Sequence, residues 1–249
     1  MSVVSESAFE SSIEAHLLSH EWLQVAPSSY DRALGLIPDE LFAFLAESQP
    51  DEWSQLVARH GGEGQARAKV VKRVADELTA RGTVDVLRSG VKDSGVSFRV
   101  AFFAPANGLT PGLLEAFESN RLGVVRQLHH SESRPHDSLD VALFVNGIPT
   151  ATAELKNPLT HQTVAHAMSQ YRTNRNPADL IFKHRAVVHF AVDPDQVYMT
   201  TRLAGEGTVF LPFNQGSGGA GQAGGAGNPV NVGGYKSAYL WERVWARDA

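Results

Sequence analysis

The chain has 249 residues, 43% of them hydrophobic and 20% charged, which is typical of a folded protein with one sizeable core or two small ones. It contains no cysteine, which excludes disulfides, thiolate zinc sites and cysteine nucleophiles, so any bound metal must have oxygen or imidazole ligands. No run approaches the roughly 20 apolar residues that cross a membrane. Because the first residues also lack the pattern of a signal peptide, we expect a cytoplasmic protein with no membrane partner.

The charged residues are unevenly distributed along the chain. The formal net charge of −5 argues by itself against a nucleic-acid partner, because phosphate contacts need Lys and Arg. Residues 121–185, however, carry eight basic and five acidic side chains, whereas residues 1–120 carry ten and 17. The middle of the chain is therefore its basic part, although an uneven solvated surface would give the same counts.

Residues 1–82 are predicted to be mainly helical, with helices over 5–18, after Pro38 and over about 65–80. From Thr83 the apolar residues alternate, which predicts strands, and residues 83–213 are expected to form the core sheet. This part also holds a short helix after Pro111, strands over 122–128, 186–192 and 197–201, and a helix from near Thr160. The predicted fold class is α/β (α+β), a central mixed β-sheet flanked by helices.

The last part of the chain begins with a glycine-rich tract. The glycine density predicts a flexible loop over residues 214–234. It does not indicate a phosphate cradle, because no Gly-Lys-Ser/Thr ending opens a helix and no Walker A pattern occurs. No ATP site is therefore predicted. Residues 235–249 are expected to form a C-terminal helix, whose Tyr239, Leu240, Trp241 and Trp245 face the core or a domain that is absent from the chain.

Residues 139–156 are the most informative segment. Two apolar runs flank Asn146-Gly147, the strongest short signal for a β-hairpin, and Pro158 stops the second run. The hairpin brings Asp140, Glu154 and Lys156 to the same end, and the last two share a face because they are two residues apart on a strand. Three charges thus converge in an otherwise apolar sheet.

Two carboxylates held close together repel each other, so a site that keeps both ionised usually offers them a divalent cation. A carboxylate-bound Mg²⁺ supplies a nucleophilic water at neutral pH and neutralises the charge of a phosphorane-like transition state. Lys156 would orient the attacking water and help to neutralise the phosphate. An ion pair that protects a sheet edge from aggregation is the structural alternative for such a trio.

The pattern of Leu139-Asp140, a hairpin and Glu154-Leu155-Lys156 resembles the PD-(D/E)xK nuclease signature, with Leu139 in place of the leading proline. The segments at 143–149, 153–160 and 187–193 resemble the N-terminal nuclease domain of type I restriction enzyme R subunits. This resemblance extends from the first helix to the last residue and implies that residues 1–249 form a single nuclease domain.

The resemblance implies a Mg²⁺-dependent endonuclease that cuts double-stranded DNA and is coupled to a DNA-translocating motor, the only part that would need ATP. It also implies a complex with methyltransferase and specificity subunits. A catalytically decayed module that holds DNA or supports assembly of the same complex is the alternative. Retention of all three charged residues favours the active enzyme.

The resemblance also points to residues around the three charges. On the helix that follows Lys156, some relatives place a Gln four residues before a Tyr; here Ala167 stands four residues before Tyr171, and Gln170 is adjacent to it. The candidate DNA-binding residues are therefore Gln170 and Tyr171 together with Arg172 and Arg175, which suit phosphate contacts better, whereas the spacing of Tyr171 is more typical of a core residue. Relatives often add an acidic residue from the first helix, which makes Glu10 a candidate metal ligand beside Asp140 and Glu154. A solvated glutamate near a helix N-terminus is the alternative for Glu10.

The register of the hairpin provides a test of the metal site. A plain two-residue turn at Asn146-Gly147 would set Asp140 opposite Ala153 and point Glu154 to the other face of the sheet. One extra residue, in the turn or in a bulge near Pro149, would set Asp140 opposite Glu154. The proposed chemistry therefore predicts a three-residue loop or a bulge between residues 146 and 150.

Overall fold

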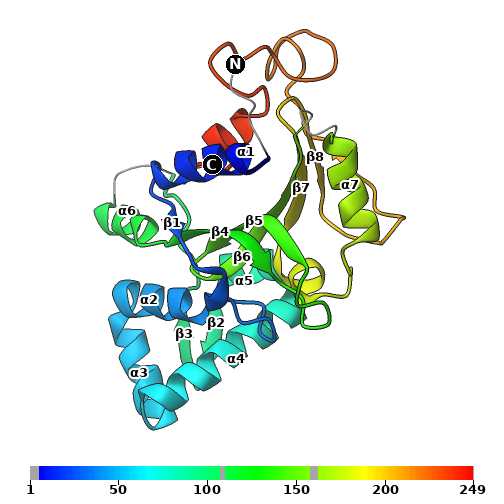
Figure 1. Ribbon diagram of the computed structural model, residues 1–249. Coiled ribbons are helices and arrows are strands. Elements are labelled where there is room, and N and C mark those ends of the chain that lie inside the picture. The colour runs from blue at the N-terminus through cyan, green and yellow to red at the C-terminus, as the bar shows by residue number, and fades with distance from the viewer. Residues whose placement is uncertain (1–5, 107–109, 158–161, 249) are drawn as a thin grey trace.

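The computed structural model describes residues 6–106, 110–157 and 162–248. Seven of its strands form one mixed sheet in the order β1-β4-β5-β6-β7-β8-β9, and β2 and β3 pair separately (Figure 1). Neighbours in the large sheet are antiparallel except for the parallel pairs β1–β4 and β6–β7. The predicted α+β architecture, a mixed sheet flanked by helices, is confirmed.

The strands of the large sheet are β1 (Leu23–Gln24), β4 (Leu122–His129), β5 (Ser138–Val145), β6 (Ile148–Leu155), β7 (Val188–Val192), β8 (Val197–Thr200) and β9 (Leu211–Pro212). The α-helices are α1 (Glu6–Leu18), α2 (Pro38–Ser48), α3 (Pro50–His60), α4 (Glu63–Arg81), α5 (Thr83–Ser89), α6 (Pro111–Glu118) and α7 (Val164–Thr173). Short helical turns occur at η1 (Pro27–Ser29), η3 (Ile181–Arg185) and η4 (Leu240–Val244), and the small sheet pairs β2 (Val91–Asp93) with β3 (Val96–Phe98).

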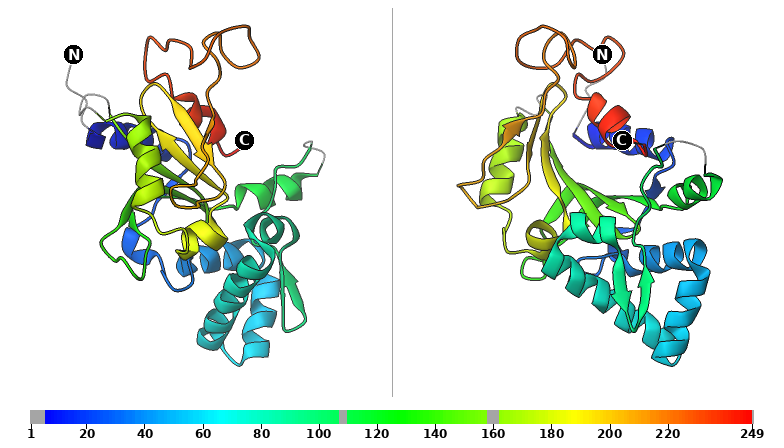
Figure 2. Two further views of the ribbon diagram at one scale, coloured as in Figure 1. Left: turned by 90° about the vertical axis from the view of Figure 1, so that its right-hand side faces the viewer. Right: turned by 180° about the vertical axis from the view of Figure 1, so that it is seen from behind.

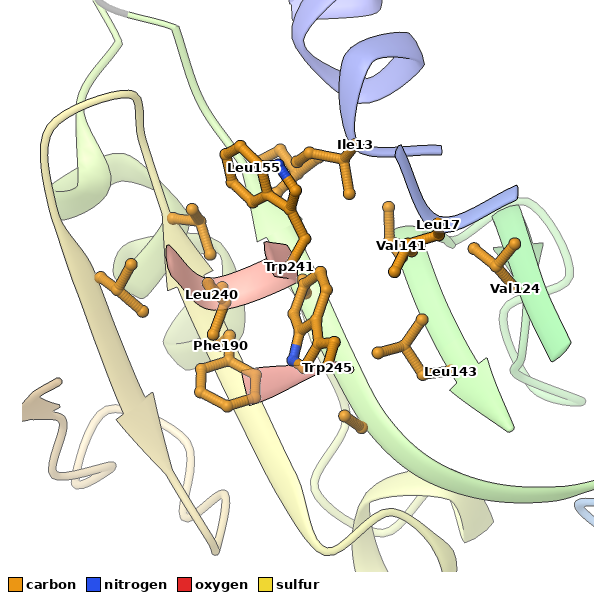
Figure 3. Close-up of a cluster of buried hydrophobic side chains, with 14 of the residues drawn as sticks. Ile13, Leu17, Val124, Val141, Leu143, Leu155, Phe190, Leu240, Trp241 and Trp245 are labelled. Carbon is orange, nitrogen blue, oxygen red and sulfur yellow. The ribbon is translucent and has the colours of Figure 1, made fainter. Parts of the chain in front are cut away.

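The two faces of the large sheet are covered by different parts of the chain. Helix α1 and the segment around η4 lie on one face, where Ile13, Leu17, Trp241 and Trp245 pack against apolar residues of the sheet (Figure 3). Helix α7 covers the other face, where Tyr171 belongs to a second buried cluster. Both ends of the described chain therefore contribute to one core layer (Figure 1).

Helices α2–α5 and the small sheet form a helical part beside one end of the large sheet (Figure 2). Pro38 and Pro50 stand at the first positions of α2 and α3, where a missing N–H costs nothing, and Gly61 ends α3 in the left-handed conformation. The strand predicted from Thr83 is wrong, because residues 83–89 form α5 and continue the helical part. The separate helix α3 was not predicted.

The β5–β6 hairpin contains the predicted bulge. Val145 pairs with Ile148 and Phe144 with Pro149, but Leu143 pairs with Ala151, so Thr150 is the additional residue on β6. The turn is tight because Asn146 (φ 51°) and Gly147 (φ 76°) are both left-handed, as a two-residue hairpin turn requires. The prediction of an irregularity between residues 146 and 150 is confirmed.

The later part of the chain contains one element that differs from its prediction. The start of the helix expected near Thr160 lies outside the described residues, and α7 begins at Val164. Residues 235–248 form only the five-residue turn η4 instead of a full helix. In the glycine-rich tract, Gly216 N–H donates to Gly227 O (2.8 Å) and Ser217 N–H to Gly225 O (2.9 Å), so the two ends of the loop are bonded to each other.

Candidate active site

Asp140 lies on β5 beside the carboxyl end of β6. Continued by one residue beyond the Val141–Ala153 pair, the shifted register sets Asp140 level with Glu154. Asp140 is 7% exposed, and its Oδ2 accepts the main-chain N–H of Leu155 at 2.7 Å. Its Oδ1 accepts a longer bond of 3.3 Å from Gln127 Nε2 on β4. Asp140 is therefore held by both neighbouring strands.

Glu154 is fully buried at the end of β6. Its Oε1 accepts a bond of 2.6 Å from Arg175 Nε, whereas Oε2 has no hydrogen-bond partner within the described part of the chain. Burial and, after it, the negative charge of Asp140 together raise the pKa of Glu154 to about 8, against the opposing effects of Arg175 and Lys156. This carboxylate thus faces another carboxylate with one oxygen left unbonded.

Lys156 follows directly after β6, and its side chain is close enough to Glu154 to lower the pKa of that carboxyl. The residue is 8% exposed, and its main-chain N–H donates to Val192 O on the parallel strand β7 (2.9 Å). The structure therefore brings Asp140, Glu154 and Lys156 to one end of the sheet.

Tyr171 lies beneath this site and not on its surface. It is fully buried, and its hydroxyl lies 2.8 Å from Thr152 Oγ1, which is also 2.8 Å from His189 Nδ1 on β7. The DNA contact expected of Tyr171 is therefore wrong. Its hydroxyl is hydrogen-bonded inside the core, where it joins α7 to β6, the strand that carries Glu154. Its position in the core agrees with the spacing that the sequence shows.

The other residues expected to bind DNA fall into two groups. Arg175 is 6% exposed and donates to Glu154 and, through Nη2, to Ser138 O (2.6 Å), so it serves the carboxylate site and is not available at the surface. Arg172 is partly exposed on α7, with Nε donating to Thr208 O (3.1 Å). Gln170 is also partly exposed on α7.

Glu10 faces the sheet from α1, as its spacing predicts, and is 6% exposed. Its carboxylate forms an ion pair with Arg126 (2.8 Å), which also pairs with Glu14 (2.9 Å). Among the residues that the structure describes, no group of three or more His, Cys, Asp or Glu side chains is arranged to hold a metal ion. The expected third ligand is thus neutralised by a guanidinium.

The two remaining carboxylates nevertheless suit a hard divalent cation. Mg²⁺ binds oxygen ligands, usually one or two protein carboxylates together with water, and does not need a complete protein cage. The unbonded Oε2 of Glu154 beside Asp140 is such a donor set, and a cation there would relieve the repulsion that raises the pKa of Glu154. Asp140 and Glu154 are therefore the residues that could hold Mg²⁺.

Two polar partners of the site were not predicted from the sequence. The sequence gives no signal for Gln127, because its contact with Asp140 depends on the pairing of β4 with β5, which has no local signature. The sequence does not reveal the bond of Arg175 to Glu154, because an arginine after a helix gives no indication of its partner. His189 and Thr152 could have been found together, since both lie on strands adjacent in the predicted core, but the order of those strands was unknown.

The mixed sheet, with buried carboxylates at one end and helices on both faces, is consistent with a nuclease-like α+β fold. The family model described as type I restriction enzyme R protein N terminus (HSDR_N) matches residues 63–208, more than half of the chain. The chain therefore belongs to this family. The matched range includes Asp140, Glu154 and Lys156 but neither α1 nor the C-terminal segment, so it is shorter than the resemblance described above.

Comparisons with curated proteins and with solved structures find no match. In the described ranges, no helix is both long and apolar enough to cross a membrane.

Proposed function

We propose that this chain is the Mg²⁺-dependent endonuclease domain of a type I restriction enzyme and that it hydrolyses DNA phosphodiester bonds at Asp140, Glu154 and Lys156. The observation that carries the proposal is the environment of the Glu154 side chain. This side chain is a fully buried carboxylate beside a second carboxylate, with one oxygen that no described group bonds. A protein maintains such an unfavourable arrangement mainly where a function requires it.

The side chains have separate roles in this proposal. Asp140 and Glu154 would hold the cation, which when bound activates a water and neutralises charge on the phosphate. Lys156 would orient the attacking water and stabilise the phosphate oxygens with its ammonium group. Arg175 keeps Glu154 in place through Oε1 and leaves Oε2 without a hydrogen-bond partner among the described residues.

The proposed partners follow from the family. Double-stranded DNA is the substrate, and the methyltransferase and specificity subunits of a type I complex are the protein partners. ATP would serve only a motor domain, since this chain has no Walker A pattern. Because residues 121–185 carry a basic excess of only three, the chain by itself should bind DNA weakly and lose affinity steeply as salt is raised.

The direct test is cleavage of DNA by the assembled enzyme with Asp140→Ala, Glu154→Gln or Lys156→Ala. Each variant should abolish cleavage, and a double variant should be no worse than a single one, because one missing member already disables the unit. Arg202→Ala, at an exposed arginine far from the site in the sequence, is the control for assembly. Near-normal cleavage by any one of the three would refute the assignment, and wild-type protein that holds DNA without cutting would favour the decayed module.

A further inference from the structure

Gln127 has an unusual backbone for a residue inside a strand. Four non-glycine residues in the described chain have positive φ, and three of them, Glu21, Ser94 and Asn146, lie in turns. Gln127 (φ 48°) lies within β4, between the pairs Arg126–Val141 and Leu128–Leu139. The pairing is in the same register on both sides, so no residue is inserted and Gln127 stands level with Asp140. A left-handed conformation is unfavourable for a side chain with a Cβ atom.

The left-handed backbone changes the direction of the Gln127 side chain. Successive residues of a regular strand point to opposite faces of the sheet. Here Arg126 Nη2 reaches Glu10 Oε2 at 2.8 Å, and Gln127 Nε2, one residue later, also lies 3.4 Å from both oxygens of Glu10. The distortion of the strand at Gln127 thus accompanies the approach of two consecutive residues to one carboxylate.

The redirected amide lies between two carboxylates that belong to different elements. Gln127 Nε2 is 3.3 Å from Asp140 Oδ1 on β5 as well as 3.4 Å from Glu10 on α1. Its Oε1 accepts the hydroxyl of Ser138 at 2.9 Å, which fixes which end of the amide faces the carboxylates. Each hydrogen bond from Gln127 Nε2 to a carboxylate is long, so the orientation of the amide depends on Asp140, Glu10 and Ser138 together.

We infer that Gln127 is a positioning residue for the candidate metal site: it orients the Asp140 carboxylate and connects it to α1 through Glu10. This inference rests on the proposed function, because Asp140 matters only if it binds the cation. Backbone strain concentrated beside a functional group is a recurring feature of such sites. Partners that orient a metal ligand typically change metal affinity on the order of tenfold or more when they are removed.

Two substitutions separate the amide from the backbone. Gln127→Ala and Gln127→Gly both remove the amide, but only alanine retains a Cβ atom in the left-handed conformation. Both variants should bind Mg²⁺ on the order of tenfold more weakly than wild type in calorimetric titrations of the whole chain. Gln127→Gly should nevertheless melt roughly 2–4 °C above Gln127→Ala, the reverse of the usual order in a strand.

Ser94 provides the matched control, since it has the same φ of 48° in the turn between β2 and β3, away from the site. Ser94→Ala and Ser94→Gly should show the same order of melting temperatures while Mg²⁺ affinity stays at the wild-type value. Mg²⁺ affinity within twofold of wild type in both Gln127 variants would overturn the inference, provided that Asp140→Ala loses binding. Equal binding by wild type and Asp140→Ala would instead refute the proposed function, and the role of Gln127 with it.

Discussion

Glu154→Gln should stabilise the metal-free protein at alkaline pH. The neutral amide has nearly the shape of the protonated carboxyl, so it removes the buried charge while retaining an acceptor for Arg175. Burial and the neighbouring Asp140 raise the pKa of Glu154 from its ordinary 4.5 to about 8. The stability associated with this raised pKa is fully present below pH 4.5 and is lost as the pH rises through about 8.

The size of the effect follows from that shift. One pKa unit corresponds to about 1.4 kcal/mol, so a displacement from 4.5 to about 8 sets an upper limit of about 5 kcal/mol on the loss. Relaxation of the surroundings and water penetration reduce the cost of a buried charge, so we expect about 2–3 kcal/mol. Wild type and Glu154→Gln should therefore unfold alike near pH 5 and diverge progressively up to pH 9.

The assay is urea unfolding of both proteins at several pH values in the presence of a chelator. When saturating Mg²⁺ replaces the chelator at pH 8, the difference in the free energy of unfolding between the two proteins should become smaller, because Mg²⁺ stabilises wild type alone. Glu115→Gln, at an exposed position on α6, controls for the loss of one surface carboxyl group. Parallel stabilities of wild type and Glu154→Gln from pH 5 to pH 9 would refute the account of Glu154 as a buried charge.

Three further predictions concern the fold, each measured as the free energy of unfolding in urea. Arg185→Met removes a buried guanidinium that donates to Leu34 O and to other groups of the helical part, so it should cost about 3 kcal/mol; a loss under about 1 kcal/mol would contradict this. Asn146→Ala leaves Val100 O and Asn120 Oδ1 without the hydrogen bonds that Asn146 donates, and it places a residue with a Cβ atom and no polar side chain at φ 51°. We expect it to lose about 2–4 kcal/mol, and Asn146→Gly should lose less. Trp241→Ala should cost about 3–5 kcal/mol through the cavity it leaves, whereas Val232→Ala, at a 98% exposed position, should be neutral.

The parts of the fold that the sequence predicts correctly are those with local signals. Asn146-Gly147 specifies the hairpin turn, and the need to place Asp140 and Glu154 on one face predicts the bulge found at Thr150. The error at Thr83 also has a local cause. In the seven-residue helix α5, Val84 and Val86 are spaced as in a strand, and so short a segment does not distinguish a period of two from 3.6. Helix α3 was missed because it buries only Leu56 and His60.

The environment of the candidate site could not be predicted, because its contacts join distant parts of the chain. The spacing of α1 correctly turns Glu10 toward the sheet, but nothing near Glu10 in the sequence reveals that Arg126 neutralises it. Arg175 bonds Glu154 across 21 positions, and Gln127 reaches Asp140 only through the pairing of two strands. Residue types and local spacing thus predicted the charged trio, and the tertiary fold determined its partners.

The core layer shared by α1 and residues 235–248 has a consequence for synthesis on the ribosome. The sheet strands that this layer covers, up to β8, leave the exit tunnel before Trp241 and Trp245, so that face stays without these side chains while the rest of the sheet is made. Contacts between residues so far apart form slowly, because a long loop must close first. While residues 235–248 are still inside the tunnel, the nascent chain would therefore expose the part of the apolar sheet face that Trp241 and Trp245 cover to chaperones and to neighbouring chains, whereas these side chains could bury it once they have left the tunnel.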